Sequence, residues 1–573
     1  MTQPPADEAF FPDRSTRYGA YPVTPLPDRT WPDQILDRAP VWCSVDLRDG
    51  NQALVEPMNP ATKLTFFKGL VDLGLKEIEV GFPSASTTEA EFIRLLVKEK
   101  AVPEDVTLQV LTPARGELIE ETLRAVECLP RVIVHLYNST SELQRRVVFQ
   151  ESRQGIVDLA CRGTEQIRSW LDKNGQTGVT FQYSPESFTG TELDFAIEVV
   201  DAVADIWGPT PESKMIINLP ATVEMSSPNV YADRVEAFGR GVRRRNQMIL
   251  SVHPHNDRGT AVAAAELGLM AGAERVEGTL FGNGERTGNV DLVTLALNLM
   301  TQGVDPGLDF QDINRLVRLA ESCTGLPVHP RHPYAGELVF TAFSGSHQDA
   351  IRKGMRAQAK AASRRWEVPY LPMDPADVGR GYDELIRVNS QSGKGGVAWV
   401  VEQAEGYSIP RRLQIEFQRS IQWEAESRSG EVDAPVIRKL FTDRYLKHKG
   451  PLCLVDGSWE IVSEGPSEWR VRVDIAKGGT VKRIEAAGNG AIDAFWIGLR
   501  KAFSLNLRLI DFSEQSLSAG SSSESVAFAE LLDEEGLPWH GVGRDSSTVV
   551  AAFRAVVGAV NLALQPAERE RVG

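Results

Sequence analysis

The stretch Met248-Ile-Leu-Ser-Val252, followed by His253-Pro-His255-Asn-Asp257, is the part of the sequence that decides the fold. Its first five residues are mostly apolar and predict a short buried strand, and the polar residues come where that strand should end. Residues i and i+2 of a strand project from the same face, so the two histidines point the same way. The pattern predicts a strand whose carboxyl end carries two imidazoles at metal-ligand spacing.

Similar short apolar runs recur on both sides of this stretch, and amphipathic segments long enough for crossover helices separate most of them. Strands are predicted at Val41–Asp46, Glu77–Gly81, Val106–Leu111, Arg131–Leu136, Gly178–Tyr183, Lys214–Asn218, Met248–Val252 and Arg275–Leu280. Eight such units in sequence favour an α/β fold of the (β/α)₈ TIM-barrel type. An open doubly wound sheet is the alternative, although it seldom needs eight consecutive units.

The rest of the 573 residues predicts three further parts. Residues 1–40 contain eight prolines and should form an extended N-terminal arm, while residues 41–330 hold the barrel. Residues 331–430 are expected to form helical linker subdomains, with a loop-like segment at 389–396 and an edge at 427–430. Residues 431–573 alternate strand and helix patterns, so they predict a C-terminal α+β domain.

Composition excludes several classes of protein. The formal charge of -16 and the pI near 5.2 disfavour nucleic acid or an anionic membrane as a partner. Five scattered cysteines without C-x-x-C spacing argue against a disulfide framework, which fits a reducing cytoplasm. Neither a signal peptide nor a membrane-spanning run is expected.

A carboxylate that could join the two histidines follows the first predicted strand, in Asp46-Leu-Arg48-Asp49-Gly50-Asn-Gln52. Strands one and seven end on the same rim of a barrel, so Asp49, His253 and His255 could form a two-histidine, one-carboxylate metal site. Such a set leaves coordination positions open for a substrate carbonyl. The alternative is that Asp49 caps a helix, Arg48 forms a salt bridge and the histidines lie in a surface turn.

Further polar residues are expected on the same rim: His135, Asn138, Ser184, Glu186, Asn218 and Thr222. After the eighth strand, the loop Gly282-Asn283-Gly284-Glu-Arg-Thr-Gly-Asn289 leads into a helix near Asp291 and could cradle an anion at its N-terminus. A tight glycine turn is the alternative. Its spacing is one residue longer than the dinucleotide fingerprint, and Ser392-Gly-Lys394-Gly lacks the residues of a P-loop.

These motifs together resemble the acyl-CoA Claisen-condensing enzymes, and most closely the 2-isopropylmalate synthase family. The resemblance includes the stretches above together with Asp28-Arg-Thr-Trp-Pro32, Glu79-Val-Gly-Phe-Pro83 and Asn218-Leu-Pro-Ala-Thr222-Val-Glu224, and it extends over nearly the whole chain. It implies condensation of acetyl-CoA with 2-oxoisovalerate to 2-isopropylmalate and CoA, the first committed step of leucine biosynthesis. It also implies a divalent cofactor (Mg²⁺, Mn²⁺ or Zn²⁺), K⁺ as an activator, and a homodimer.

Roles for individual residues follow from the resemblance alone. Asp49, His253 and His255 would be metal ligands, with Asn289 as a weaker or water-mediated fourth. Arg48 would neutralise charge on the ketone oxygen. His347, in Ser344-Gly-Ser-His347-Gln-Asp349, would be the base, with Glu186 as its partner and Tyr370 assisting from the same half-site of the other subunit. The remaining substrate contacts would come from Thr222, Ser184, His135, Gly282, Asn283 and Gly284.

The C-terminal domain resembles the family's leucine-sensing domain in two glycine motifs. These are Ala487-Gly488-Asn-Gly490-Ala491-Ile-Asp493 and Trp539-His-Gly541-Val-Gly543-Arg-Asp545, and they imply that leucine acts as an allosteric inhibitor. Ala491 departs from the family's usual proline and Ala551-Ala552 from its usual Ala-Ser, which leaves the catalytic interpretation untouched.

Other activities remain open at this point. Homocitrate or citramalate synthase would differ mainly in the pocket for the oxo-acid side chain. An acyl-CoA lyase would run the cleavage direction, but such lyases generally lack a sensing domain like residues 431–573. An amino-acid sensor with an inactive barrel is the non-enzymatic alternative, and a complete Asp49, His253, His255, Glu186 and His347 set argues against it.

Overall fold

The computed structural model describes residues 18–342, 344–361, 365–381, 398, 400–402, 405–428, 432, 434–447, 450–463, 469–517 and 523–565. The chain divides into two compact units, residues 1–339 with 377–379, and residues 340–376 with 380–573. The loop predicted at 389–396, and the end of the edge predicted at 427–430, lie outside the described residues.

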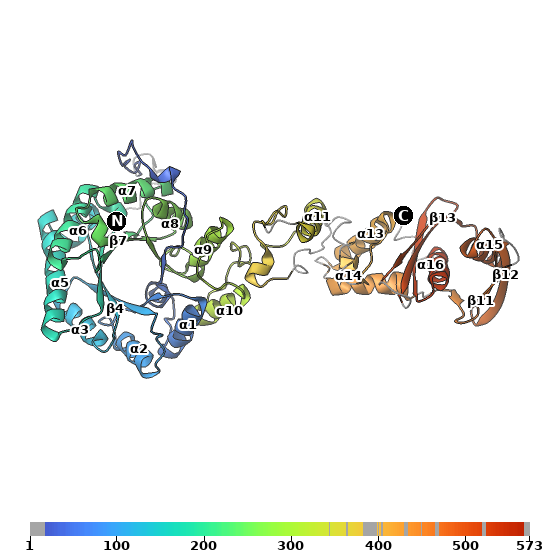
Figure 1. Ribbon diagram of the computed structural model, residues 1–573, viewed down its shortest axis with the longest axis horizontal. Coiled ribbons are helices and arrows are strands. Elements are labelled where there is room, and N and C mark those ends of the chain that lie inside the picture. Colours follow the sequence, from blue (N-terminus) through green and yellow to red (C-terminus); the bar gives the residue numbers. More distant parts are fainter. Residues whose placement is uncertain are drawn as a thin grey trace, which may run out of the picture. The chain divides into compact units, whose positions relative to one another are not determined.

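The first unit is a closed barrel of eight parallel strands that pair in sequence order, with helices around it (Figure 1). The strands are β1 (Val41–Ser44), β2 (Glu77–Gly81), β3 (Thr107–Pro113), β4 (Val132–Ser139), β5 (Val179–Glu186), β6 (Met215–Ala221), β7 (Met248–Pro254) and β8 (Arg275–Gly278). The barrel closes where Val41 of β1 pairs with Arg275 of β8. The predicted TIM-barrel fold class is confirmed.

The helices that cover the barrel follow the strands in alternation. They are α1 (Pro60–Leu73), α2 (Thr87–Lys98), α3 (Gly116–Val126), the short α4 (Glu142–Gln144), α5 (Arg153–Asn174), α6 (Leu193–Trp207), α7 (Pro228–Gly241), α8 (Ala261–Met270), α9 (Leu292–Thr301) and α10 (Ile313–Thr324). Local sequence sets several of their starts: the side chains of Ser86 and Ser152 accept hydrogen bonds from the first-turn amides of α2 and α5.

The strand boundaries differ from the sequence prediction at the carboxyl ends. Strands β4, β5 and β6 extend beyond Leu136, Tyr183 and Asn218, where they were predicted to end. Asn138, Ser184 and Glu186 therefore lie within strands and not after them. A polar residue such as Ser184 suggested a strand end, but its hydroxyl contacts His135 and Asn218 on the neighbouring strands β4 and β6, so the ladder can continue through it.

The eighth strand is instead shorter than predicted, because it ends at Gly278. A Cβ atom at that position would lie 2.6 Å from the carbonyl oxygen of Val290, so only glycine permits the following loop to return this closely to the strand. The chain then makes a short turn at Leu280–Gly282 before α9.

The described part of the N-terminal arm lies along α7 of its own barrel. The indole nitrogen of Trp31 donates to Asp233 at 2.8 Å, and the backbone amide of Thr30 donates to Glu236 at 3.0 Å. Apart from one short turn at Trp31–Asp33, residues 18–40 contain no regular element. The arm is held by side-chain hydrogen bonds and not by a sheet.

The second unit contains α11 (Gly345–Lys360), α13 (Arg411–Arg428), α14 (Ala434–Phe441) and two antiparallel sheets. One sheet consists of β9 (Leu452–Leu454), β10 (Glu460–Ser463), β11 (Trp469–Lys477) and β12 (Thr480–Gly488), with α15 (Ala491–Phe503) packed on it. The other consists of β13 (Arg508–Ser516), β14 (Ser525–Leu532) and β15 (Pro538–Asp545), with α16 (Thr548–Ala563) packed on it. The predicted α+β character of this part of the chain is confirmed.

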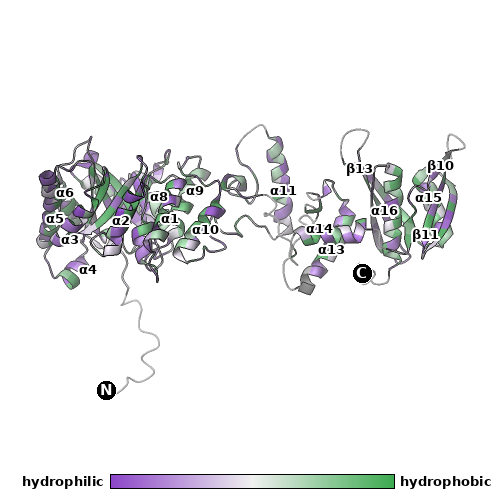
Figure 2. Cartoon of the chain, turned by 90° about the horizontal axis from the view of Figure 1, so that it is seen from below, coloured by the Kyte–Doolittle hydropathy of each residue, from purple (hydrophilic) through white to green (hydrophobic). Residues whose placement is uncertain are grey.

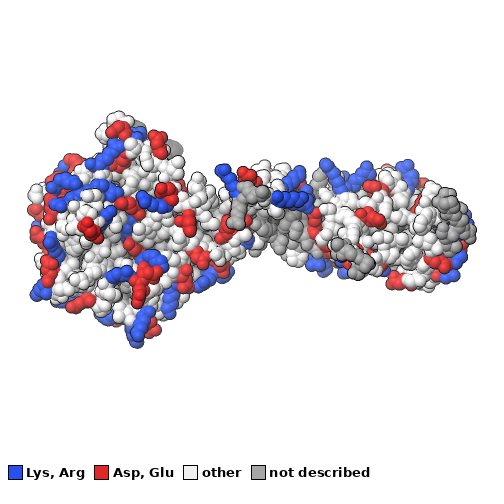
Figure 3. Space-filling view, in the orientation of Figure 1, with Lys and Arg blue, Asp and Glu red and all other residues white. Residues whose placement is uncertain are grey.

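Helix α16 is the apolar centre of the second unit. Figure 2 colours most of it green, and its buried residues are alanine, valine, leucine and phenylalanine with one glycine and one asparagine. None of the described helices is both long and apolar enough to cross a membrane. Acidic and basic side chains are interspersed on the visible surface of each unit in Figure 3, although the net charge is -16.

Candidate metal centre and active site

A tight turn after β1 positions the first part of the site. The backbone amides of Arg48, Asp49 and Gly50 all donate to the carbonyl oxygen of Val45, at 3.2, 2.9 and 3.1 Å. The buried Asp46 carboxylate anchors this turn by accepting from the backbone amide of Leu280 at 3.0 Å, and burial raises its pKa to about 7. The turn thereby directs Arg48 and Asp49 into the mouth of the barrel.

The carboxyl end of β7 supplies the two imidazoles, as the i, i+2 spacing predicts. The rings of His253 and His255 are nearly parallel, with centroids 5.3 Å apart and an interplanar angle of 7°. The backbone amide of His255 donates to Ala221 at the end of β6, which holds the chain in extended form beyond the strand. Both side chains are buried.

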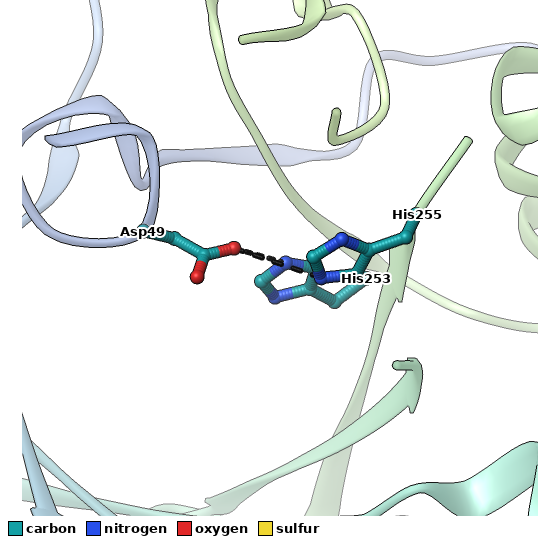
Figure 4. A group of neighbouring side chains, drawn as sticks. All are labelled: Asp49, His253 and His255. Carbon is teal, nitrogen blue, oxygen red and sulfur yellow. Dashed lines mark ion pairs between the residues drawn. The ribbon is translucent and has the colours of Figure 1, made fainter. Parts of the chain in front are cut away.

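Asp49, His253 and His255 form a buried cluster whose ligand atoms all lie within 4.8 Å of one another. Asp49 Oδ2 lies 3.4 Å from His253 Nε2 and 3.6 Å from His255 Nε2, and Figure 4 shows the carboxylate directed at both rings. That buried oxygen has no hydrogen-bond partner among the described residues. Two imidazole nitrogens and an unsatisfied carboxylate oxygen are a donor set that fits a divalent cation.

The protonation equilibria of the three groups reflect their crowding. Burial raises the pKa of Asp49, but Arg48 and the imidazoles outweigh it and hold this pKa well below its usual range. Burial lowers the pKa of His253, but Asp49 and Glu277 outweigh it and raise the value to about 10. Burial and then the neighbouring His253 lower the pKa of His255 to about 4. The surroundings of Asp49 thus favour one positive charge beside its carboxylate, and a bound cation would provide that charge.

Asn289 contributes a further oxygen to the same cluster. Its Oδ1 lies 2.8 Å from His253 Nε2, and its Nδ2 donates to the carbonyl oxygen of Asn283 at 3.1 Å, which fixes the orientation of the amide. The oxygens of Asp49 and Asn289 and the Nε2 of His253 therefore face one another, and three acceptors cannot satisfy each other without a proton or a cation between them. This arrangement fits a metal ligand set of which Asn289 is the fourth member.

The glycine loop after β8 holds Asn289 in place. A Cβ atom on Gly284 would lie 2.2 Å from the Asn289 side chain, and one on Gly288 would lie 1.9 Å from the carbonyl oxygen of Gly282. The first amides of α9 donate to the carboxylate of Asp291, at 3.0 and 3.2 Å. The helix terminus predicted to cradle an anion is therefore occupied by the chain's own carboxylate, and substrate binding by Gly282, Asn283 and Gly284 stays a prediction.

A cavity of about 340 Å³ opens beside the cluster. Arg48 and Arg286 are its cations, while Phe82, Leu111 and Pro220 give it an apolar part. The other lining residues are Asp49, Gln52, His135, Tyr137, Ser184, Glu186, Asn218, Thr222, His253, His255 and Glu285. The rim residues predicted from sequence, apart from Asn138, thus come together in one cavity.

Glu186 is the last residue of β5, and its carboxylate accepts no hydrogen bond from the part of the chain that the structure describes. Burial raises its pKa, and Arg48 opposes this effect. Thr222 accepts a hydrogen bond from the backbone amide of Ser187 at 2.9 Å, so its hydroxyl is held beside the end of β5. A half-buried carboxylate of raised pKa at the edge of a cavity is suited to proton transfer near neutral pH.

Sequence reasoning missed a network of buried charges below the cavity. Arg275 and Glu277 on β8 and Glu79 on β2 are fully buried, and all three belong to hydrogen-bonded ion pairs. The sequence does contain a pattern that indicates this network. Glu77-Ile-Glu79 and Arg275-Val-Glu277 carry charged residues at i and i+2 within predicted buried strands. Such a pattern places the charges on one face and requires partners inside the barrel.

His347 and Tyr370 belong to the second unit, and the structure brings them together there. Their rings stack with centroids 4.1 Å apart and an interplanar angle of 26°. His347 lies on the first turn of α11 and is exposed, while Tyr370 is 62% exposed and has a φ of 65°. The prediction that these two side chains act in one half-site is consistent with this pairing, and their catalytic roles stay predictions.

The glycines predicted to be regulatory divide into two kinds. A Cβ atom on Gly541 or Gly543 of β15 would lie 1.9 Å from a backbone oxygen of α16, so these glycines allow the helix to pack directly on the strand. Gly488 lies similarly close to the start of α15, whereas Gly490 has no atom within 4 Å of a Cβ position. A packing role is evident for three of them, and a role in ligand binding stays a prediction.

Comparisons with known proteins agree with this architecture. Residues 39–320 match the family model described as HMGL-like, residues 337–402 the alpha-isopropylmalate synthase post-catalytic domain, and residues 431–564 the LeuA allosteric (dimerisation) domain. The 2-isopropylmalate synthase of Rhodospirillum rubrum is 52% identical over 96% of this chain and 99% of its own length. The chain belongs to the 2-isopropylmalate synthase family.

A second member of this family, from Pseudomonas putida, is 51% identical over 97% of this chain and 98% of its own length. Among solved structures, the hydroxymethylglutaryl-CoA lyase from Pseudomonas aeruginosa matches with a TM-score of 0.41 and 20% sequence identity. The match covers 51% of this chain and 95% of the lyase chain. The family resemblance predicted from the sequence motifs is confirmed over nearly the whole chain.

Proposed function

We propose that this chain catalyses the condensation of acetyl-CoA with 3-methyl-2-oxobutanoate (2-oxoisovalerate) and water to 2-isopropylmalate and CoA. The observation that carries the proposal is the buried Asp49, His253 and His255 cluster beside a cavity with Arg48, in a chain of this family. Such a reaction is an acyl transfer in which the acetyl methyl carbon attacks a ketone, and it is the first committed step of leucine biosynthesis.

Asp49, His253, His255 and Asn289 would hold the divalent cation. When bound, such an ion polarises the ketone of the 2-oxo acid as a Lewis acid. Mixed imidazole and oxygen ligands suit Zn²⁺ or Mn²⁺, and less readily Mg²⁺. A monovalent cation such as K⁺ as an activator is a further part of the proposal.

The cavity supports a branched oxo acid as the acceptor. Arg48 lies beside Asp49 and would stabilise negative charge that develops on the ketone oxygen, as a preorganised cation does. Thr222 would donate to the substrate carboxylate. Phe82 and Leu111 offer apolar surface for an isopropyl group, whereas the longer carboxylate arm of 2-oxoglutarate would need another cation at that position.

Proton removal from the acetyl methyl group requires a base. We assign this role to His347, with Tyr370 stacked on it and Glu186 as a partner on the barrel. Imidazole suits general-base catalysis at neutral pH. Since His347 and Tyr370 lie outside the barrel unit, we propose that the other subunit of a homodimer supplies them, with the match to a dimerisation domain as support.

Residues 431–573 would act as the leucine-binding regulatory domain, and residues 331–430 would form linker subdomains. The enzyme would act in the cytoplasm. Support for leucine inhibition comes from the match to an allosteric domain over residues 431–564. Homocitrate and citramalate synthase differ from the proposed activity only in the acceptor, so the choice of oxo acid separates them.

The test is release of the CoA thiol from acetyl-CoA in metal-replete protein, with 2-oxoisovalerate, 2-oxoglutarate or pyruvate as acceptor, with and without leucine. Preference for 2-oxoisovalerate is expected, together with suppression of the rate by leucine. Preference for another acceptor would contradict the proposed substrate, and absence of release with all three would contradict the proposed activity.

A further inference from the structure

The carboxylate of Glu277, on β8, collects five hydrogen bonds from five strands of the barrel. Its Oε1 accepts from Gln109, Gln182 and Arg275 at 2.9, 2.7 and 2.8 Å. Its Oε2 accepts from the Nδ2 of Asn218 at 3.0 Å and from the Nδ1 of His253 at 2.8 Å. Glu277 is fully buried, so nothing but these donors compensates its charge.

We propose that Glu277 is a positioning residue for the metal centre, which fixes the ring and the tautomer of His253. An ionised carboxylate can only accept, so the hydrogen bond to Glu277 requires the proton of His253 on Nδ1. The other ring nitrogen, Nε2, then points toward Asp49 and Asn289, where a cation would bind to its lone pair in place of a proton. Carboxylate partners of this kind hold a ligating imidazole in one orientation and increase its basicity.

Glu277 is itself held in one position by an ion pair on the side away from His253. Arg275 donates to Glu277, to Ser251 at 2.9 Å, to Glu77 at 2.6 Å and to Gln109 at 2.8 Å. Arg275 is fully buried, as is Ser251. The carboxylate therefore has no freedom to follow a moving ring, and the orientation of His253 is decided before any ligand binds.

The same carboxylate connects the metal side of the cavity with Arg48 through a directional chain of hydrogen bonds. Asn218 donates to Glu277 and also to the hydroxyl of Ser184 at 3.1 Å, and that hydroxyl lies 2.7 Å from His135 Nε2. The Nδ1 of His135 lies 2.9 Å from Glu79, which pairs with Arg48. Because Glu79 only accepts, Ser184 must donate to His135, and every member of the chain has a defined direction.

The experiment compares Glu277→Gln and Glu277→Asp with Ser251→Ala in the full-length protein. The control residue lies on the same strand and face as His253 and contacts the same Arg275, but it does not touch a metal ligand. The metal-free proteins are titrated with Co²⁺, followed by visible absorption, and their melting temperatures are recorded without metal. Catalytic rates are measured afterwards over a range of Co²⁺ concentrations.

Glu277→Gln is expected to weaken Co²⁺ binding about 10- to 100-fold, because an amide would present an N–H group where only acceptors fit. Ser251→Ala should lower the melting temperature but leave Co²⁺ binding within about twofold. Saturating Co²⁺ should restore much of the rate of Glu277→Gln. Co²⁺ binding of Glu277→Gln within about twofold of the wild type would overturn the proposal and leave Glu277 a purely structural residue.

Glu277→Asp decides the question if Glu277→Gln does not fold, since it keeps the charge and withdraws the carboxylate by one methylene group. It should bind Co²⁺ several-fold more weakly, and unchanged binding would again overturn the proposal. The inference rests on the proposed function only for the identity of the site as a metal centre. The Co²⁺ titration contains no substrate, so wild-type protein that binds Co²⁺ but releases no CoA would contradict the proposed function alone.

Discussion

The interior of the barrel and the interior of the terminal sheet domain are built in opposite ways. Inside the barrel, strands contribute charged and amide side chains that lie at 0% exposure, among them Glu79, Gln109, Gln182, Arg275 and Glu277. In the terminal domain, α16 buries a run of small and branched apolar residues against β14 and β15. The barrel interior holds fixed dipoles beside a cavity, whereas the largest described cluster of the terminal domain is held together by apolar packing.

The terminal domain gains its close packing from glycine and alanine. Gly541 and Gly543 present bare backbone to α16, where Ala551 and Ala555 approach them. The helix also buries Asn561, which accepts from and donates to the backbone of Leu452 at 2.9 and 2.7 Å and so joins β9 to the helix. Mutations in the two regions should therefore have different effects. Changes inside the barrel should mainly reduce function, and changes in the packed core of the terminal domain should mainly reduce stability.

The largest expected effect is the loss of the metal centre. His253→Ala should lower both metal affinity and kcat/KM by on the order of 10³-fold, because it removes a proposed ligand atom, and Lewis-acid polarisation contributes several kcal/mol. Metal titration and CoA release measure the two losses. Normal metal binding in this variant would show that the barrel's polar interior serves stability alone.

His347→Ala should separate chemistry from metal binding. We expect a loss of about 10²-fold or more in kcat with unchanged metal affinity, because a general base contributes in that range and His347 lies outside the unit that contains the metal cluster. Single-turnover rates and a Co²⁺ titration test this expectation. Near-normal turnover would show that the base has been assigned to the wrong residue.

Gly541→Ala should destabilise the terminal domain by about 1–3 kcal/mol, because the new methyl group would meet the backbone of α16 and not a movable side chain. Metal affinity of the barrel should not change. Gly490→Ala is the matched control, since no atom lies within 4 Å of its Cβ position, and it should cost less than about 1 kcal/mol. Calorimetry of both variants checks the difference, and equal losses would contradict it.

A smaller, pH-dependent effect is expected where α13 meets β15. Glu416 is buried and lies beside His540, Arg444 and Tyr445, with the Tyr445 hydroxyl donating at 2.9 Å. Burial raises the pKa of Glu416, but His540 and Arg444 outweigh it and lower this pKa. A carboxyl whose folded pKa is depressed contributes stability that is present above its unfolded pKa, about 4.3, and is lost as the pH falls through the folded value.

Glu416→Gln should therefore lower the stability of the second unit by about 1–2 kcal/mol near neutral pH, and its difference from the wild type should shrink below about pH 4. Thermal melts across pH 3.5 to 8 measure this difference. A gap that stays constant down to pH 3.5 would show that the charge of Glu416 contributes nothing and that only its shape matters.

Much of the fold could be predicted because alternating apolar and amphipathic segments are local signals. All eight barrel strands were placed by this pattern. The turn between β11 and β12 is built on Gly478 and Gly479, whose φ values of 54° and 83° suit glycine. The predicted ends of β4, β5 and β6 were wrong, since a polar residue such as Ser184 suggests a strand end unless its partners on the neighbouring strands are known.

By itself the sequence determined the order of the strands, the pairing of His253 with His255 on one strand face, and the membership of the family. These follow from spacing along the chain, which a strand preserves. Only the tertiary structure decided that Asp49 Oδ2 faces both imidazoles without a partner, and that Glu277 fixes His253. The reason is that hydrogen bonds between residues of distant strands depend on how the barrel closes, and no local pattern records that closure.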